Sequence, residues 1–327
     1  MSLLDDSSIL ITGGTGSLGK ALVSYLLNST KVRRVVILSR DELKQHHMRA
    51  DFHDDPRLRW FLGDIRDSQR LEHAFHKVDF VIHAAALKQV DTAEYNPMEF
   101  IKTNVLGSQN VIDAAISSGV KRVVALSTDK ASSPINLYGA TKLTADKLFV
   151  AANNYGFGYG TAFSVVRYGN VMGSRGSVIP FFQELALQNK PLPITDQRMT
   201  RFLISLEQAV KFVINSLEMM AGGELYVPKI PSMKIVDLAQ AIAPGSEMKE
   251  IGMRPGEKLH EEMISADDSR RTFDLGDRFI VTPVVAEWGY VAPSGKKVDD
   301  GFAYRSDTNQ DWMSPSQLRE FISSLKQ

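Results

Sequence analysis

Cysteine is absent from the 327 residues of this chain, so neither a disulfide framework nor a thiolate metal site can form. Net charge is also lacking, because 38 Lys and Arg balance 38 Asp and Glu. Proteins that bind nucleic acids or membrane surfaces usually carry a basic excess, so we expect neither partner. The seven His are scattered without the spacing of a zinc helix, and we expect no metal.

Long apolar runs and a targeting segment are missing as well. The opening residues MSLLDDSS contain neither a basic stretch nor a long apolar stretch, and the strand-like run 9–12 is far too short to span a bilayer. We therefore expect a cytoplasmic protein. What the chain does contain is 43% hydrophobic residues, which suffice for one large core or two smaller ones.

Short β-branched and aromatic runs alternate with helical patterns in the first half of the chain. Such alternation is typical of βαβ units, which build a parallel sheet with helices on both faces. Leu18, Leu22, Tyr25 and Leu26 recur at helical spacing and predict a right-handed crossover helix. The runs expected to form strands are 8–12, 35–38, 59–62, 80–83, 123–127 and 163–168. The predicted fold class is α/β, with a doubly wound parallel sheet of the Rossmann type.

After Tyr168 this rhythm breaks, and Gly and Pro interrupt shorter elements. A helical pattern beginning at Leu206 and a strand-like run 225–227 indicate a return to the first sheet. We therefore predict two interleaved domains. The first comprises residues 1–168 and about 203–228, and a smaller α/β substrate-binding domain comprises about 169–202 and 229–327.

A glycine-rich turn follows the first expected strand. The segment Gly13-Gly-Thr-Gly-Ser-Leu-Gly19 has glycine at every third position from Gly13 and leads into a helix. Glycine permits a tight turn and a close approach to a pyrophosphate, while the free amides of a helix N-terminus attract its charge. This junction predicts a dinucleotide site rather than a merely structural turn. The turn residues predicted to contact the cofactor are Gly13, Thr15, Gly16, Ser17, Leu18 and Gly19.

The end of the second expected strand indicates which dinucleotide binds. NAD-binding proteins usually have an acidic residue there, but this chain has Ser39 and Arg40, with Lys44 one helical turn later. Cations favour the 2′-phosphate of NADP. Asp41 follows immediately and is an acidic residue of the kind that binds NAD, so NADP is the favoured cofactor and NAD the alternative.

Residues after the third and fourth expected strands extend the predicted cofactor site. Asp64 and Ile65 would reach the adenine. The small side chains of Ala84, Ala85 and Ala86 would let the cofactor pass closely, although ordinary helix–sheet packing also explains them.

Residues 127–142 carry the catalytic hypothesis. Tyr138 and Lys142 are four residues apart, so they point the same way from one helix. Beside a nicotinamide, the phenol can act as a base on a sugar hydroxyl while the ammonium lowers the pKa of the phenol. Asp129 and Lys130 precede them and would serve a second reaction that a simple dehydrogenase does not need. A solvated pair in a loop is the alternative interpretation of these two charges.

Tyr138-x-x-x-Lys142, the glycine-rich turn and Asn104 in Thr103-Asn-Val-Leu-Gly107 together resemble the extended form of the short-chain dehydrogenase/reductase superfamily. In that superfamily, nucleotide-sugar 4,6-dehydratases have Thr-Asp-Glu before the Tyr, whereas epimerases tend to have small hydroxyl or alanine residues. This chain has Thr128-Asp-Lys130. That variant resembles the inverting UDP-N-acetylglucosamine 4,6-dehydratases, which open the pseudaminic acid pathway.

The resemblance covers nearly the whole chain, weakens after about residue 267, and fits the short form of the family that has no membrane-spanning N-terminal region. One departure is Gln89-Val-Asp91, where the family leads us to expect His-Val-Pro, and it affects the sugar pocket rather than the reaction class. The other matching segments are Ser39-Arg-Asp-Glu-Leu-Lys44, His83-Ala-Ala-Ala-Leu-Lys88, Val166-Arg-Tyr-Gly-Asn170, Gly173-Ser-Arg-Gly-Ser177, Met199-Thr-Arg-Phe202 and Arg254-Pro-Gly-Glu-Lys-Leu-His260.

The resemblance implies a lyase that uses redox chemistry internally. Tyr138 would take the proton of the 4-hydroxyl as hydride goes to NADP, Lys142 would hold the nicotinamide ribose, and Thr128 would hydrogen-bond the developing ketone. Lys130 would then remove the proton of carbon 5, and Asp129 would protonate the departing 6-hydroxyl. Hydride returns to carbon 6, and a proton that reaches carbon 5 from the opposite face inverts it to the L-arabino configuration.

This mechanism sets a condition on Lys130. An amine acts as a base only when its pKa falls well below the solution value of about 10.4. We expect desolvation or the neighbouring cations Lys142 and Lys88 to lower the pKa of Lys130.

The nucleotide end of the substrate needs cations and a slot for the base. Asn170, Arg175 and Arg254 can meet the diphosphate, and Glu257 can meet a ribose hydroxyl, although each Arg could equally form a surface ion pair. The residues predicted to bind substrate are Lys88, Asn170, Arg175, Val178, Pro193, Thr195, Arg201, Arg254 and Glu257. Lys88 and Asn104 are also predicted to bind the cofactor.

Three other functions remain open. A UDP-hexose 4-epimerase or a retaining 4,6-dehydratase would share Tyr138 and Lys142 but move different protons. A regulatory protein that senses NADP without turnover has usually lost one of these two residues, and both are present here. The resemblance also implies a homo-oligomer, a hexamer built from dimers, although no segment of the chain fixes that number.

Overall fold

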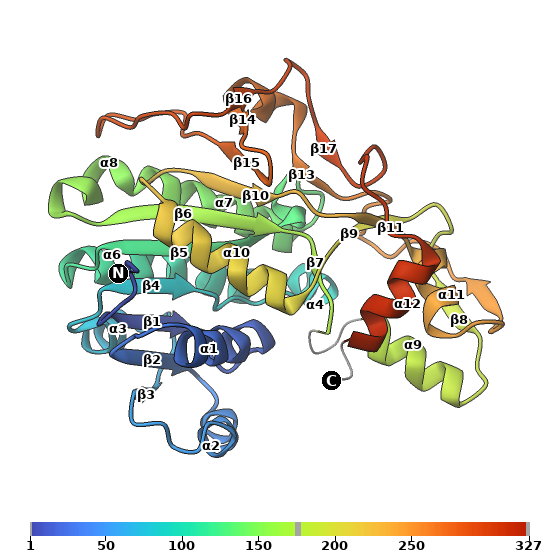
Figure 1. The fold of residues 1–327 in the computed structure, drawn as a ribbon, viewed down its shortest axis with the longest axis horizontal. Helices are drawn as coiled ribbons and strands as arrows, with labels where there is room; N and C mark the ends of the chain where they lie inside the picture. The colour runs from blue at the N-terminus through green and yellow to red at the C-terminus, as the bar shows by residue number, and fades with distance from the viewer. Residues whose placement is uncertain (1, 174–177, 325–327) are drawn as a thin grey trace.

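The computed structural model describes residues 2–173 and 178–324 (Figure 1). The larger lobe is built on a ten-stranded sheet in the order β16-β14-β15-β10-β6-β5-β4-β1-β2-β3. Neighbouring strands from β10 to β3 are parallel, and β14, β15 and β16 extend the sheet in antiparallel pairs. The strands are β1 Ser8–Thr12, β2 Arg34–Ser39, β3 Leu58–Leu62, β4 Phe80–His83, β5 Arg122–Thr128, β6 Ala162–Tyr168, β10 Leu225–Pro228, β14 Thr272–Asp274, β15 Arg278–Val281 and β16 Lys296–Lys297. The predicted α/β fold with a Rossmann-type sheet is confirmed.

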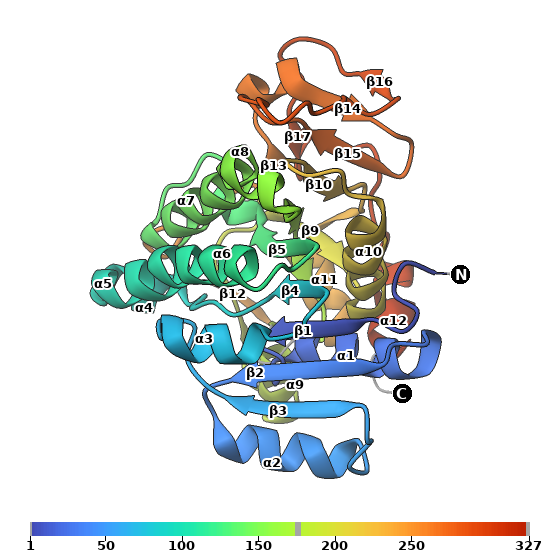
Figure 2. The same cartoon turned by 90° about the vertical axis from the view of Figure 1, so that its left-hand side faces the viewer.

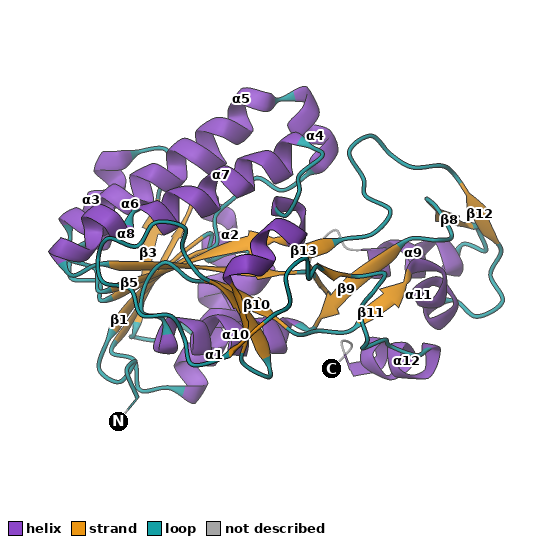
Figure 3. Ribbon diagram, turned by 90° about the horizontal axis from the view of Figure 1, so that it is seen from above, coloured by secondary structure: helices purple, strands orange, loops and turns teal. Residues whose placement is uncertain are grey.

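Helices cover both faces of this sheet (Figures 2 and 3). Helices α1 and α10 pack together on one face, and α3, α6 and α7 pack together on the other. Successive strand residues point to opposite faces, so Leu10 joins the core under α6 and α7 while Ile9 and Ile11 join the core under α1. The helices of this lobe are α1 Ser17–Ser29, α2 Glu42–Asp51, α3 Ser68–Phe75, α4 Val90–Tyr95, α5 Pro97–Phe100, α6 Gly107–Ser117, α7 Leu137–Ala151, α8 Asn153–Gly156 and α10 Leu206–Met219.

The smaller lobe, on the right in Figure 1, has its own apolar core. Leu203, Met233, Leu238 and Leu318 pack there between a three-stranded sheet, β11-β9-β7, and the helices α11 and α12. A second pair, β12-β8, packs beside α9. The elements are β7 Asn170–Val171, β8 Leu192–Ile194, β9 Thr200–Ile204, β11 Ser232–Lys234, β12 Met248–Glu250, α9 Val178–Leu187, α11 Ile235–Ile242 and α12 Pro315–Ser324. A short pair, β13 Glu262–Ile264 with β17 Tyr304–Arg305, lies between the lobes.

The chain passes from the larger lobe to the smaller one and back again. After β9 it returns through α10 to β10, which lies beside β6 with Tyr226 opposite Val166. Strands β14 to β16 also belong to the large sheet, although they fall within the residues assigned above to a substrate-binding domain. The domain division itself stays a prediction. Among the described residues, no helix combines the length and the apolar character needed to cross a membrane.

Candidate active site

A cavity of about 710 Å³ opens where the parallel strands of the large sheet end. Its walls come from the segments that follow β1, β2, β3, β4, β5 and β6. Because β2 and β4 lie on opposite sides of β1, the chain leaves this edge of the sheet in two directions and opens a crevice there. The smaller lobe supplies the opposite wall through residues such as Val178 and Met233.

Most residues predicted to bind the cofactor line this cavity on the side of the large sheet. Asn104 is the exception, because it is buried behind the wall, where its amide bonds both the N–H and the carbonyl of Leu87. It therefore fixes the segment after β4 from behind. The predicted cofactor residues that line the cavity are Gly13, Thr15, Gly16, Ser17, Leu18, Gly19, Ser39, Arg40, Lys44, Asp64, Ile65, Ala84, Ala85, Ala86, Lys88, Tyr138 and Lys142.

The glycine-rich turn has the shape that a pyrophosphate cradle requires. Gly13 has φ of 67°, which favours glycine, and a Cβ on it would lie 2.9 Å from the backbone of Ala85. The turn therefore packs directly against the segment after β4. Helix α1 begins at Ser17 with its N-terminal turn in the cavity wall, so its free amides can meet an anion. These features fit a dinucleotide.

The cations predicted to hold a 2′-phosphate are already paired with carboxylates. Arg40 lies 3.7 Å from Asp64, and Lys44 lies 2.8 Å from Asp41. All four side chains line the cavity. A bound phosphate would therefore share these cations with the two acids.

Helix α7 carries Tyr138 and Lys142 into the same cavity. The side chain of Asn136 caps the helix by accepting a hydrogen bond from the N–H of Gly139 at 2.7 Å. Lys142 is buried, and its Nζ donates to the carbonyl of Leu126 at 2.7 Å. The cap and this hydrogen bond fix both side chains against the end of β5.

The environment of Tyr138 differs from the sequence-based expectation. Burial raises the pKa of Tyr138 to about 12, and the Lys130 cation and a hydrogen bond with Thr128 oppose that rise. The expectation that Lys142 supplies the opposing charge was wrong, since Lys130 supplies it here. The reason is geometric: the Lys142 ammonium is turned toward the Leu126 carbonyl.

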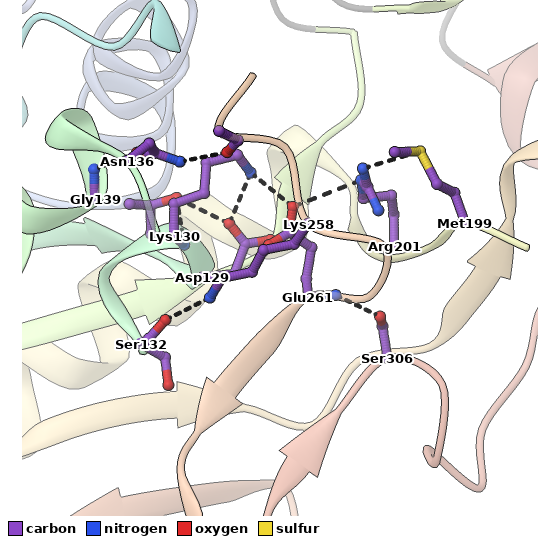
Figure 4. Close-up of polar contacts among 12 residues, drawn as sticks. Asp129, Lys130, Ser132, Asn136, Gly139, Met199, Arg201, Lys258, Glu261 and Ser306 are labelled. Carbon is purple, nitrogen blue, oxygen red and sulfur yellow. Dashed lines mark hydrogen bonds and ion pairs between the residues drawn. The ribbon is translucent and has the colours of Figure 1, made fainter. Parts of the chain in front are cut away.

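Lys130 lies between two buried carboxylates (Figure 4). Its Nζ is 3.0 Å from Asp129 Oδ1 and 3.3 Å from Glu261 Oε1. Asp129 is 1% exposed and Glu261 is 2% exposed. Thr128 Oγ1 also donates to Asp129 Oδ1, at 2.9 Å. Lys130 lines the cavity and Asp129 lies buried behind it, so the two form a largely buried pair and not a solvated loop pair.

The charge state of Lys130 is the reverse of the one expected from the sequence. Burial lowers the pKa of Lys130, but the negative charges of Asp129 and Glu261 outweigh it, and the pKa is raised overall. The cations expected to lower it were Lys142 and Lys88. Lys88 instead lies exposed on the cavity wall, and Lys142 is bonded to a backbone carbonyl.

Two residues of this cluster were missed in the sequence. Glu261 is one, and Lys258 is the other, since its Nζ donates to the carbonyl of Ser132 at 2.6 Å. Asn136 also donates to the carbonyl of Gly256 at 2.7 Å, so the segment 256–262 is held against the catalytic loop, residues 129–136 between β5 and α7. The only signal was position: Lys258 lies within the Arg254–His260 motif and Glu261 directly follows it, and that motif was singled out for other reasons.

The predicted substrate residues are divided between several places. Lys88, Asn170 and Val178 line the cavity. Arg201 lies behind it, where its Nε is 3.6 Å from Glu261 Oε1. Four of the predicted residues lie in the smaller lobe or its adjoining loop and do not line the described cavity: Pro193, Thr195, Arg254 and Glu257. Arg175 lies outside the described residues.

Comparisons with known proteins agree with this geometry. A family model described as polysaccharide biosynthesis protein matches residues 9–283. A protein of Campylobacter jejuni named UDP-N-acetylglucosamine 4,6-dehydratase (inverting) is 54% identical over 329 aligned residues, which cover 98% of each chain. A UDP-glucose 4-epimerase of Rickettsia canadensis is 44% identical over 84% of this chain and 82% of its own.

Solved structures with the same fold include a nucleotide-sugar 4,6-dehydratase. Pen from Bacillus thuringiensis is 38% identical, covers 99% of both chains and superposes with a TM-score of 0.91. DesIV from Streptomyces venezuelae, a dTDP-glucose 4,6-dehydratase with NAD and TYD bound, is 26% identical over 86% of this chain and 93% of its own, with a TM-score of 0.71. The chain therefore belongs to the polysaccharide biosynthesis protein family, which is of the extended short-chain dehydrogenase/reductase type, and groups there with the inverting UDP-N-acetylglucosamine 4,6-dehydratases.

Proposed function

We propose that this protein is a hydro-lyase that removes water from UDP-N-acetylglucosamine and inverts carbon 5. The product would be UDP-2-acetamido-2,6-dideoxy-β-L-arabino-hex-4-ulose. The observation that carries the proposal is the Lys130–Asp129 pair beside Tyr138, because it puts an amine and a carboxyl next to the phenol that would start the reaction. An oxidation alone would need only Tyr138 and Lys142.

The first step would be oxidation of carbon 4. A nicotinamide dinucleotide in the cavity would supply the chemistry, taking a hydride from carbon 4 and returning it later to carbon 6. Tyr138 would accept the proton of the 4-hydroxyl in its phenolate form, which the positive charge of Lys130 favours. Thr128 would hydrogen-bond the new ketone, and Lys142 would hold a ribose hydroxyl.

The second step would be loss of water across carbons 5 and 6. In the resting protein Lys130 is an ammonium and Asp129 a carboxylate, joined by a hydrogen bond of 3.0 Å. Transfer of one proton along this bond gives the amine and the acid that the step needs. Lys130 then takes the proton of carbon 5, and Asp129 gives its proton to the departing hydroxyl. The pair ends with the proton count it began with. A proton that originates from solvent is then delivered to the opposite face of carbon 5 and inverts that carbon.

We infer that the cofactor is NADP. Arg40 and Lys44 line the cavity beside Ser39, where a 2′-phosphate would lie, and two cations there favour it over a hydroxyl. NAD is the alternative, because Asp41 and Asp64 partly neutralise these cations.

An isotope experiment tests the proposed function. We would incubate the protein with UDP-N-acetylglucosamine in deuterated water and follow the sugar by NMR. Deuterium at carbon 5, a new 6-methyl group in an L-arabino product and no net NADPH would support the proposal. A galacto product would indicate the 4-epimerase, a 6-methyl group without inversion a retaining dehydratase, and absence of turnover the NADP-sensing regulator. Each of these three results would contradict the proposal.

We further propose that the enzyme works in the cytoplasm as a homo-oligomer, a hexamer built from dimers, and supplies the first step of pseudaminic acid synthesis. The support for these points is the family resemblance. Sedimentation velocity would measure the assembly directly, and a monomer at micromolar concentration would contradict the hexamer.

A further inference from the structure

Glu261 is a buried carboxylate that the proposed reaction does not use. Its Oε1 lies 3.3 Å from Lys130 Nζ, while its Oε2 is buried and has no hydrogen-bond partner among the described residues. Asp129 has the same arrangement, with Oδ1 bonded to Lys130 and Oδ2 unpartnered. Burying a carboxylate whose hydrogen bonds are not all made costs free energy of folding. The presence of a second such carboxylate beside Lys130 therefore requires an explanation.

The side chain of Glu261 is held in place from the smaller-lobe side. Arg201 Nε lies 3.6 Å from Glu261 Oε1, and the Arg201 guanidinium is itself fixed by the carbonyls of Thr200 and Leu259. The backbone N–H of Glu261 donates to Ser306 Oγ at 2.9 Å. Figure 4 shows Glu261 between Arg201 and Lys130, with dashed lines from the Lys130 ammonium to both Glu261 and Asp129.

We propose that Glu261 is a positioning residue that holds the Lys130 ammonium at the cavity wall and keeps one proton on the Lys130–Asp129 pair up to alkaline pH. The inference rests on the proposed function, because it assigns the pair its acid and base roles. Glu261 takes no proton itself. It acts through its charge, which stabilises the ammonium that forms when Lys130 removes the proton of carbon 5.

The charged and titratable groups around Lys130 support this assignment. Asp129 and Glu261 are the negative neighbours, and Arg201 is a positive neighbour behind Glu261. Lys258 faces the cluster from the adjoining loop, and Tyr138 faces it from α7. Burial lowers the pKa of Lys258 despite the acids nearby, whereas the pKa of Lys130 is raised. The pKa values of the two lysines are therefore shifted in opposite directions, and Lys130 is the lysine that lies between the two carboxylates.

The proton count explains why the charge of Glu261 matters. While the pair holds one proton, exchange between Lys130 and Asp129 produces an amine and an acid together. When the pair loses that proton to solvent, no acid remains for the departing hydroxyl, and elimination stops. The alkaline limit of turnover therefore follows the pKa of Lys130, and a raised pKa moves that limit upward.

The test replaces Glu261 by Gln, which keeps the shape and removes the charge. Glu262→Gln is the matched control, since Glu262 accepts hydrogen bonds from Ser132 and Ser133 and makes no ion pair with Lys130. The pKa of Lys130 is read without turnover, from the pH dependence of its acetylation by acetic anhydride, quantified by mass spectrometry. We expect Glu261→Gln to lower this pKa by about one to three units. We expect no comparable shift in Glu262→Gln, and a smaller shift in Glu261→Asp, which retains the charge.

Turnover is measured on the same proteins as a function of pH. In Glu261→Gln the pH above which kcat declines should fall by the same amount as the pKa of Lys130. An unchanged Lys130 pKa in this variant would overturn the inference. Should the variant fail to fold, the same acetylation experiment on the wild-type protein provides the test. The inference requires the pKa of Lys130 to lie above that of Lys258, and the reverse order would overturn it. A shifted pKa with no dehydration in the wild type would instead refute the proposed function.

Discussion

Gly139 lies so close to Lys130 that a Cβ built on it would be 2.2 Å from the carbonyl oxygen of Lys130. This contact presses the first turn of α7 against the short helical turn Asp129–Ala131, and it brings Tyr138 next to Lys130. The phenol and the amine therefore depend on a position where only glycine fits.

The first prediction concerns that position. Gly139→Ala forces the two backbones apart, and we expect it to lower the free energy of unfolding by about 1–3 kcal/mol. Misplacement of the phenol should lower kcat by about 10²-fold. Gly158→Ala is the control, because a Cβ there meets no atom within 4 Å. Urea unfolding and steady-state kinetics provide the measurements, and wild-type kinetics in Gly139→Ala would contradict the prediction.

The second prediction separates oxidation from elimination. Lys130→Met removes the base, and we expect turnover to fall by about 10²- to 10⁴-fold. Oxidation of carbon 4 should be affected less, because Tyr138 and Lys142 remain. Stopped-flow absorbance of the reduced nicotinamide would follow the oxidation, with exposed Lys121→Met as control. Equal losses in both steps would show that Lys130 acts on oxidation instead.

The third prediction concerns cofactor choice. Arg40→Ala should weaken NADP binding by about 10- to 150-fold, the value of a charged hydrogen bond, and leave NAD binding nearly unchanged. Arg49→Ala is the control, since Arg49 pairs with Asp54 on the far end of α2. Calorimetric titration with both dinucleotides tests the prediction, which fails if Arg40→Ala weakens both equally.

The fourth prediction concerns the buried ion pair behind Lys142. Arg167 lies 3.0 Å from Asp146, which also accepts a hydrogen bond from Ser127. Arg167→Met leaves a buried carboxylate without its cation, and we expect a loss of about 3–5 kcal/mol in the free energy of unfolding. Lys211→Met removes a cation from an exposed pair and should leave the free energy of unfolding nearly unchanged. Chemical denaturation measures both, and equal stability of the two variants would be evidence against this role.

The fifth prediction concerns pH and a buried histidine. Burial lowers the pKa of His83 to about 3, and its Nδ1 lies 2.8 Å from Thr12 Oγ1. That hydroxyl accepts from the amides of Ala84 and Ala85, so it donates to His83, which is therefore a neutral acceptor at Nδ1.

The sign of the pH effect follows from the two pKa values of His83. In the unfolded chain the pKa is about 6.5, so the unfolded state binds the proton first as the pH falls. Stability should be independent of this group above pH of about 6.5 and should decline below it, by at most about 1.4 kcal/mol per pH unit. His83→Gln should lack this component of the slope. Urea unfolding at several pH values compares the two proteins, and parallel slopes would disprove the assignment.

The sequence predicted the parts of the structure that depend on local pattern. Strand runs such as 80–83 and the glycine-rich turn were recognisable because periodicity and glycine act over a few residues. The same holds for Tyr138 and Lys142, which share one helix. The residues that these local patterns singled out line much of the cavity wall.

The charge of Lys130 could not be predicted in this way. Its partner Glu261 is distant in the sequence and reaches it only because the segment 256–262 folds back onto the catalytic loop. Reasoning from neighbours along the chain suggested cations, whereas the tertiary structure supplies a carboxylate. Arg201 was likewise assigned to the substrate, although its nearest acid is Glu261.

The return of the chain from the smaller lobe to β10 has a consequence for how the protein is made. Val165 and Leu225 are neighbours in the sheet, yet the residues between them include the whole of α9, β9 and α10. A nascent chain that ends before β10 has β6 as an unpaired edge, and the large sheet can close only after the intervening segment has emerged from the ribosome. Closure over such a sequence distance is slow, so until then the outer edge of β6 is open to pairing with another chain.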